Sequence, residues 1–307
     1  MPPRLATDAS LLHDPAINSV YRDIDGLELH AVVAGDPDDP LVVLHHGFPE
    51  FWWGWADYVR PLVDAGYRVL VPDGRGYNLS EAPDTLPEYT TDRLSADVAT
   101  WIRSEGKESA HVVGHDWGAA VAWDAALRRS DLVDRLVTIN VPHPAAFAGA
   151  LMPSRERWRL NLQQWRRSWY ILLFQLPWLP EWLNRRRDYE GMARFLRQAS
   201  PGTFSDADMD RYRAAWSRPG ALGAMLDWYR AAVQHRPDLP GTTVEQPTLV
   251  IWGEDDDALL PELAERSVGF CENGRLERFP DATHWVTHER PEAVTELIVD
   301  HLGGGGG

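Results

Sequence analysis

Short apolar segments rich in β-branched residues alternate with longer amphipathic segments along most of this chain. The segments that we predict as strands are LVVLHHG (41–47), RVLVPDG (68–74), SAHVVGHD (109–116), VDRLVTINVP (133–142), PTLVIWGED (247–255) and GRLERFPDA (274–282). Helices are predicted at 51–67, 89–106, 117–130, 261–269 and 291–302. Alternation of this kind predicts a mostly parallel sheet flanked by crossover helices, an α/β fold. Two earlier runs, SVYRDIDG and LELHAVVAG, predict an antiparallel hairpin at the sheet edge.

Between about residues 142 and 243 the predicted strands disappear, and helical segments rich in Trp and Arg replace them. Because the alternation returns afterwards, this stretch is typical of a helical insertion between two strands of one sheet. We therefore expect a core made of residues 1–141 and 243–302, an inserted helical cap at 142–242, and a flexible Gly tail at 303–307.

The longest apolar run, WYILLFQLPWLP (169–180), is too short to span a bilayer and contains two prolines. Arginines flank it, which leaves interfacial membrane contact open, but we expect a buried helix here. The chain should therefore have no integral membrane segment.

Charge and cysteine content exclude several classes of function. The formal net charge of -16 argues against nucleic acid as a partner. With Cys271 as the single cysteine, no disulfide within the chain and no thiolate metal cluster can form. The first residues lack a basic-then-apolar signal peptide, so we expect a cytoplasmic protein. We also expect that it needs no metal and no cofactor. A homo-oligomer is compatible with this composition.

The pentapeptide GHDWG (114–118) has the small-x-acid-x-small pattern of a nucleophile elbow between a strand and a helix. Gly114 and Gly118 permit the tight turn that would lift Asp116 out of the strand end. The alternative is that Asp116 only caps the following helix, as Asp often does.

Two later residues favour the catalytic interpretation. Asp256 follows the next-to-last predicted strand, and His284 follows the last one. The order nucleophile, acid, histidine is that of an α/β-hydrolase triad. Asp255 and Asp257 are weaker candidates for the acid that orients His284.

The loop HHGFPE (45–50) follows an early predicted strand. The backbone N–H of Phe48, paired with that of Trp117, would form an oxyanion hole. This Gly-Pro loop is also compatible with a cis peptide at Pro49. His45 and His46 are adjacent in sequence, which suits one shared metal poorly, so we interpret them as structural.

Together these motifs resemble those of the epoxide hydrolases of the α/β-hydrolase fold, over nearly the whole chain. HGFPEFWWGW is similar to their oxyanion-hole motif, PDGRGYNLSEAP to the loop that follows, and GHDWG to their nucleophile motif. Within the insertion, WYILLFQLPWLPE and LDWYR are similar to the segments that supply their lid tyrosines, which here are Tyr170 and Tyr229. Asp227 stands where relatives often carry Asn. The resemblance implies a small-molecule epoxide as substrate, an Asp116 ester intermediate and a diol product.

Other functions fit parts of this pattern. A haloalkane dehalogenase would use the same Asp116 with Trp117 and a second halide donor, for which Trp169 is a candidate because Phe48 fills the usual Asn position. A fluoroacetate dehalogenase needs arginines where Trp117 and Ala120 stand. A non-catalytic ligand receptor would not require all of Asp116, Asp256 and His284. The numerous tryptophans of the insertion suggest a roomy aromatic pocket; they are Trp165, Trp169, Trp178, Trp216 and Trp228.

Overall fold

A computed structural model of the chain describes residues 6–152, 154, 158–235 and 238–304, and the strands in these ranges form one eight-stranded sheet. The strands are β1 (Asn18–Ile24), β2 (Leu27–Ala34), β3 (Leu41–His45), β4 (Arg68–Pro72), β5 (Ala110–His115), β6 (Val133–Ile139), β7 (Thr248–Gly253) and β8 (Gly274–Phe279). Their order is β1-β2-β4-β3-β5-β6-β7-β8. β2 is antiparallel to β1 and β4, and all other neighbours are parallel. The predicted edge hairpin and parallel sheet are therefore confirmed.

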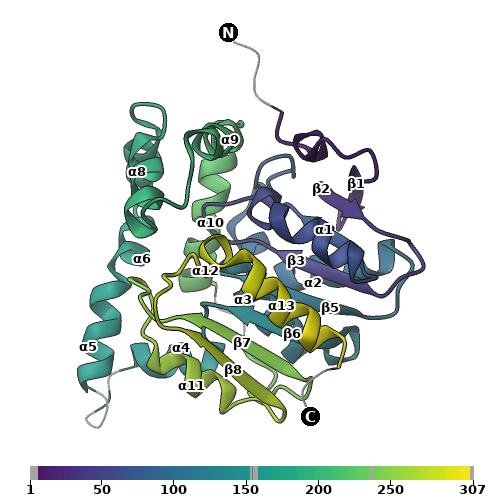
Figure 1. Ribbon diagram of the computed structural model, residues 1–307. Helices are drawn as coiled ribbons and strands as arrows, with labels where there is room; N and C mark the ends of the chain where they lie inside the picture. The colour runs from purple at the N-terminus through teal and green to yellow at the C-terminus, as the bar shows by residue number, and fades with distance from the viewer. Residues whose placement is uncertain (1–5, 153, 155–157, 236–237, 305–307) are drawn as a thin grey trace.

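Helices cover both faces of this sheet (Figure 1). Those of the core are α1 (Ala56–Asp64), α2 (Thr91–Ser104), α3 (Trp117–Arg128), α11 (Glu262–Val268), α12 (Val286–Glu289) and α13 (Pro291–Leu302), with 3₁₀ turns at Ala9–Leu12, Trp52–Trp55, Leu86–Tyr89 and Ser130–Leu132. α1 packs against α13, and α2 against α3. The chain passes from β3 through α1 to β4 in one direction across the sheet. It passes from β4 through α2 to β5, and from β5 through α3 to β6, in the other direction. Right-handed crossovers therefore place α1 on one face of the sheet and α2 and α3 on the other.

This change of direction determines where a ligand site can form. The chain leaves β3 toward one edge and later enters β5 on the other side of β3. The loops after β3 and β5 therefore diverge to opposite faces at the carboxyl ends of the strands, the position where open α/β sheets bind their ligands. The loop 45–50 and Asp116 both lie at this position.

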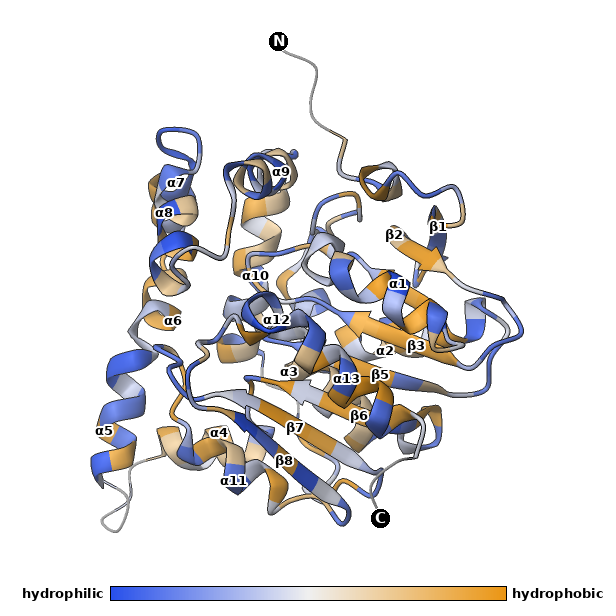
Figure 2. Ribbon diagram, in the orientation of Figure 1, coloured by the Kyte–Doolittle hydropathy of each residue, from blue (hydrophilic) through white to orange (hydrophobic). Residues whose placement is uncertain are grey.

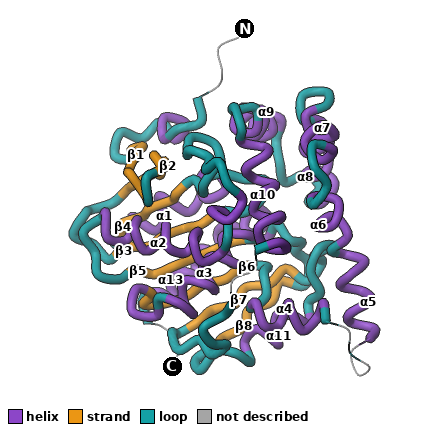
Figure 3. Tube along the Cα trace, turned by 180° about the vertical axis from the view of Figure 1, so that it is seen from behind, coloured by secondary structure: helices purple, strands orange, loops and turns teal. Residues whose placement is uncertain are grey.

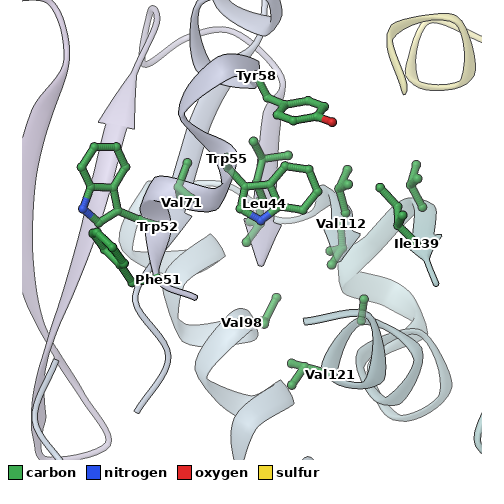
Figure 4. Packing of buried hydrophobic residues seen from close by; sticks show 14 of the residues in the cluster. Leu44, Phe51, Trp52, Trp55, Tyr58, Val71, Val98, Val112, Val121 and Ile139 are labelled. Atoms are coloured by element: carbon green, nitrogen blue, oxygen red, sulfur yellow. The ribbon is translucent and has the colours of Figure 1, made fainter. Parts of the chain in front are cut away.

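The middle of the sheet is buried on both faces, which explains its nearly continuous apolar sequence. All five residues of β3 and all six of β7 are buried. Figure 4 shows how Leu44 of β3 and Val112 of β5 lie among the aromatic side chains of residues 51–58 on one side and Val98 and Val121 on the other. Eight of the 15 tryptophans are buried, which accounts for much of the core volume.

The predicted helices and strands differ from the observed ones mainly at their ends. The strand predicted at 133–142 stops at Ile139, because Asn140 adopts a left-handed conformation with φ of 48°. The helix predicted at 51–67 begins as a 3₁₀ turn and becomes α-helical only at Ala56.

Between β6 and β7 the described chain contains helices and no strand; we call this helical segment the cap. It consists of α4 (Pro144–Leu151), α5 (Trp158–Arg167), α6 (Trp169–Phe174), α7 (Leu179–Arg185), α8 (Glu190–Ala199), α9 (Asp206–Trp216) and α10 (Ala221–Gln234). Viewed from behind in Figure 3, α5 to α9 lie to one side of the sheet, whereas α4 lies beside α11 of the core. Of the Gly tail, Gly303 and Gly304 follow α13, whereas 305–307 lie outside the described residues.

The expectation of a buried helix at 169–180 is wrong. α6 ends after six residues, and the side chains of Trp169, Leu172, Leu176 and Trp178 are exposed. Across the described part of the chain, helices are all too short or too polar to cross a bilayer.

Candidate active site

Asp116 stands at the turn between β5 and α3 with φ of 50° and ψ of -125°, a strained conformation for a residue with a side chain. The neighbouring glycines make this turn sterically feasible. A Cβ on Gly118 would lie 1.9 Å from the carbonyl oxygen of His45, and one on Gly114 would lie 2.3 Å from the backbone of Gly118. The Asp116 side chain makes no capping hydrogen bond to α3, so the alternative that it is only an N-cap is wrong.

His284 connects Asp116 with a second carboxylate. Its Nε2 lies 3.3 Å from Oδ2 of Asp116, and its Nδ1 lies 2.6 Å from Oδ2 of Asp256. Asp256 is buried, whereas its neighbours Asp255 and Asp257 are exposed and have no role in this contact. The three residues predicted from sequence order thus lie in one hydrogen-bonded row at the carboxyl ends of β5, β7 and β8.

Sequence reasoning missed Asn140, which follows β6. Its side-chain amide donates to Oδ2 of Asp256 over 2.9 Å and to the carbonyl of Gly253. The other oxygen of Asp256 accepts from the backbone N–H groups of Ala258 and Leu259. The available signal was a polar residue directly after a buried strand, at the sheet edge where the other site residues lie.

Burial alone would lower the pKa of His284, but the charge of Asp256 and hydrogen bonds to Asp116 and Asp256 outweigh it and raise the pKa to about 10. The same interactions with His284, together with the Asn140 hydrogen bond, keep the pKa of Asp256 low despite its burial. His284 is therefore held as an imidazolium between the side chains of Asp116 and Asp256.

The loop after β3 supplies a donor to Asp116. The backbone N–H of Phe48 donates to Oδ1 of Asp116 over 2.6 Å. The peptide between Phe48 and Pro49 is cis, as the loop sequence allowed. Residue 47 must be glycine because a Cβ at this position would lie 2.3 Å from Cβ of Asp116. The N–H of Trp117 is the first of α3 and so lacks an acceptor within the helix.

The cap brings its two candidate tyrosines together. The rings of Tyr170 on α6 and Tyr229 on α10 lie 6.0 Å apart, and Tyr229 also packs edge-on against Phe48 and Trp117. Burial, with the nearby charge of Asp116, raises the pKa of Tyr229 well above 10 and also raises that of Tyr170. A hydrogen bond from the Trp117 side chain acts in the opposite direction on Tyr229. Both phenols remain protonated donors at neutral pH.

The cap tryptophans do not line one common pocket. Trp216 and Trp228 are buried and donate to the carbonyls of Pro49 and Arg75. Three others, Trp165, Trp169 and Trp178, are exposed. The exposure of Trp169 removes the candidate for a second halide donor.

Two further sequence-based interpretations concern side chains near the site. Burial and the adjacent His46 lower the pKa of His45 to about 3, which leaves it a neutral core residue. His46 accepts a hydrogen bond from the backbone of Gly74. Asp227 forms an ion pair with Arg230.

A buried carboxylate beside the site was also missed. Glu50 lies 2.6 Å from Nε2 of His288, 2.7 Å from the hydroxyl of Tyr212 and 3.3 Å from Nδ1 of His115. Nε2 of His115 in turn faces the backbone carbonyl of His284. Glu50 therefore links the loop after β3 to strand β5, helix α12 and cap helix α9.

Comparison with known proteins shows which family this chain belongs to. Residues 40–291 match the model of the alpha/beta hydrolase fold family. The chain is 42% identical to the AB hydrolase superfamily protein YfhM of Bacillus subtilis over 289 residues, which cover 92% of this chain and 96% of that protein. It is 33% identical to epoxide hydrolase A of Mycobacterium tuberculosis over 315 residues, covering 92% and 96%. The crystal structure of the Bacillus megaterium epoxide hydrolase with an inhibitor superposes with a TM-score of 0.82 at 28% identity, covering 92% and 100%.

Proposed function

Because the chain belongs to the epoxide hydrolases of the α/β-hydrolase fold family, we propose that it converts an epoxide and water to a vicinal diol through an ester of Asp116. The observation that carries this proposal is that two sets of groups lie near Asp116. His284 lies 3.3 Å from its carboxylate and is paired with Asp256, and the cap phenols of Tyr170 and Tyr229 lie close enough for its charge to raise their pKa values.

An aspartate suits this substrate because an epoxide has no carbonyl carbon to attack. It offers a saturated carbon in a strained C–O bond, which a carboxylate can displace from behind. The bond from Asp116 to carbon forms as the ring C–O bond breaks, and the ring oxygen takes a proton from Tyr170 or Tyr229. The enzyme then holds an alkyl ester whose carbonyl is its own.

Ester formation also prepares His284 for the second step. The charge of Asp116 and its hydrogen bond both raise the pKa of His284 in the free enzyme, and esterification removes that charge. The pKa of His284 should then fall, so that the imidazolium gives up a proton, which restores the phenol that donated to the ring oxygen, and the neutral imidazole can act as a base toward water. Asp256, held by Asn140, continues to orient the ring.

Water activated by His284 attacks Cγ of Asp116, and the oxyanion is stabilised by the N–H groups of Phe48 and Trp117. Collapse of this intermediate releases the diol, and Asp116 keeps one oxygen from water. The hydrogen bond that Phe48 already donates to Asp116 Oδ1 supports this role.

A single turnover in ¹⁸O-water, with enzyme in excess over styrene oxide, tests the proposal. Label should enter the Asp116 carboxylate, and the first diol should carry none from solvent. Label in that first diol would mean that water attacks the epoxide directly. Release of bromide from 1-bromobutane without turnover of styrene oxide would instead identify a haloalkane dehalogenase, and no turnover of either would favour a receptor.

A further inference from the structure

The outer edge of the cap carries most of the exposed large apolar side chains among the described residues. Thirteen such side chains are exposed, and eleven of them lie between Met152 and Phe195. All five exposed tryptophans fall within 158–182: Trp158, Trp165, Trp169, Trp178 and Trp182. Helices α5 to α8, which carry most of the exposed apolar side chains of this edge, stand in a column at one side of the molecule (Figure 1).

Helix α5 is turned with its polar side toward the protein. Gln164 and Asn161 are 0% and 4% exposed, and the Gln164 amide bonds to the backbone of Ala258 and Leu260. The apolar side chains instead form a stripe on the outside of α5 and α6 at spacings of four and three residues: Trp158, Leu162, Trp165, Trp169, Leu172 and Leu176. An amphipathic helix oriented this way gains nothing from its apolar face unless another apolar phase covers it.

The stripe continues at Trp178, which is 70% exposed. Its backbone has φ of 53°, in the left-handed region that bulky side chains rarely adopt. A large apolar side chain is thus held in solvent by a strained backbone.

The charge of this edge is opposite to that of the rest of the protein. Residues 158–197 contain eight arginines and three acidic residues, a net charge of +5, although the whole chain carries -16. Arg159, Arg166, Arg185, Arg186 and Arg187 are exposed, and Arg186 lies over the ring of Trp182. Figure 2 shows hydrophilic segments beside apolar ones on α5, α7 and α8.

From this pairing we propose that the outer edge of the cap is a docking surface for anionic phospholipid bilayers. Tryptophan side chains favour the bilayer interface, and helices that bind there combine Trp and Leu on one face with Arg or Lys on the other. An anionic bilayer complements the positive edge of an otherwise acidic protein, whereas a second copy would place arginine against arginine. The proposal concerns a surface away from Asp116 and does not depend on the reaction.

Flotation on density gradients tests it, using unilamellar vesicles of phosphatidylcholine with phosphatidylglycerol and vesicles of phosphatidylcholine alone. The protein should float with the anionic vesicles and much less with the neutral ones, and molar salt should weaken the binding. Trp169→Gln/Trp178→Gln should remove it. Arg185→Gln/Arg186→Gln should weaken binding to anionic vesicles by roughly 10- to 30-fold, at about 1 kcal/mol for each arginine.

Arg103→Gln/Arg290→Gln is the matched control, since it changes the net charge equally at two exposed arginines of the core. It should bind like the unaltered protein, and epoxide turnover and circular dichroism should show that all variants are folded. If the control variant loses as much vesicle binding, net charge alone explains the effect of the arginines, and the proposal is overturned. The absence of flotation with either vesicle, or a dimer in sedimentation velocity that only the tryptophan substitutions dissociate, would also overturn it.

Discussion

Glu50 Oε1 lies 2.6 Å from Nε2 of His288, although the two residues are 238 positions apart in the chain. Burial raises the pKa of Glu50, but the charge of His288 and hydrogen bonds to His115 and His288 outweigh it and hold the pKa below its usual range. The pKa of His288 is raised by the charge of Glu50, despite burial that would lower it. The two residues are therefore a buried ion pair that fastens the loop after β3 to α12.

Glu50→Gln should lower the free energy of unfolding by about 3–5 kcal/mol, because it leaves the charge of His288 buried without its counterion. Urea denaturation measures this loss. Glu50→Gln/His288→Gln should cost less than the sum of the single substitutions, since neither charge is then stranded. Additive losses would show that the two side chains contribute independently.

The pair should also give the stability a pH dependence with a defined sign. The lowered pKa of Glu50 adds stability above its ordinary pKa of 4.5, which is lost on acidification. The raised pKa of His288 adds stability below its ordinary pKa of 6.5, which is lost as the pH rises through the folded value. The difference in unfolding free energy between the unaltered protein and Glu50→Gln should therefore be largest between these two values and smaller on either side.

His284→Ala should still form the ester and then stop, because the proposed base acts only in the second step. Intact-protein mass spectrometry should show the chain plus the mass of one epoxide. The control His284→Ala/Asp116→Ala, which lacks the nucleophile, should keep its unmodified mass. If folded His284→Ala also stays unmodified, His284 is needed before the ester forms.

Hydrolysis of the preformed ester should accelerate with pH through a midpoint below about 10, the pKa of His284 when Asp116 is ionised. The reason is that the ester carries no charge to stabilise the imidazolium, so the base form appears at lower pH. Quenched-flow measurement of ester decay at a series of pH values gives this midpoint. A midpoint at or above 10 would mean that esterification leaves His284 unchanged.

Tyr170→Phe and Tyr229→Phe should each slow ester formation by up to roughly 10²–10³-fold, the range for loss of one oxyanion donor. The double variant should nearly abolish ring opening, because neither hydroxyl remains to protonate the oxygen. Hydrolysis of the ester should change much less, since it uses other groups. Ring opening by the double variant near the unaltered rate would assign both tyrosines to cap packing alone.

The sequence located the parts of this site that follow strands. Apolar periodicity identified the strand ends, and Asp116, Asp256 and His284 follow three of them in an order that few folds share. Tyr170 and Tyr229 could be selected only through resemblance, because nothing in a helical pattern says which aromatic residue faces a distant loop.

Two features were beyond sequence reasoning for physical reasons. The contacts of Glu50 come from segments far apart in the chain, and only the folded arrangement brings them together. The apolar character of the run 169–180 predicts a buried helix, but hydropathy does not say which face of a helix meets the protein. The preceding helix α5 shows the same effect: Gln164 and Asn161 lie on the face that meets the protein, and the apolar side chains lie on the outside.

The glycine contacts around Asp116 have an evolutionary consequence. A Cβ on Gly47 would meet Cβ of Asp116 as well as its carboxylate, and one on Gly114 or Gly118 would meet only backbone atoms, so all three positions stay restricted to glycine whichever polar group residue 116 carries. The backbone geometry at residue 116 therefore does not depend on the functional group that its side chain carries. Under the proposed mechanism, exchanging this carboxylate for a hydroxyl would transfer the reacting carbonyl from enzyme to substrate, with the surrounding backbone already in place.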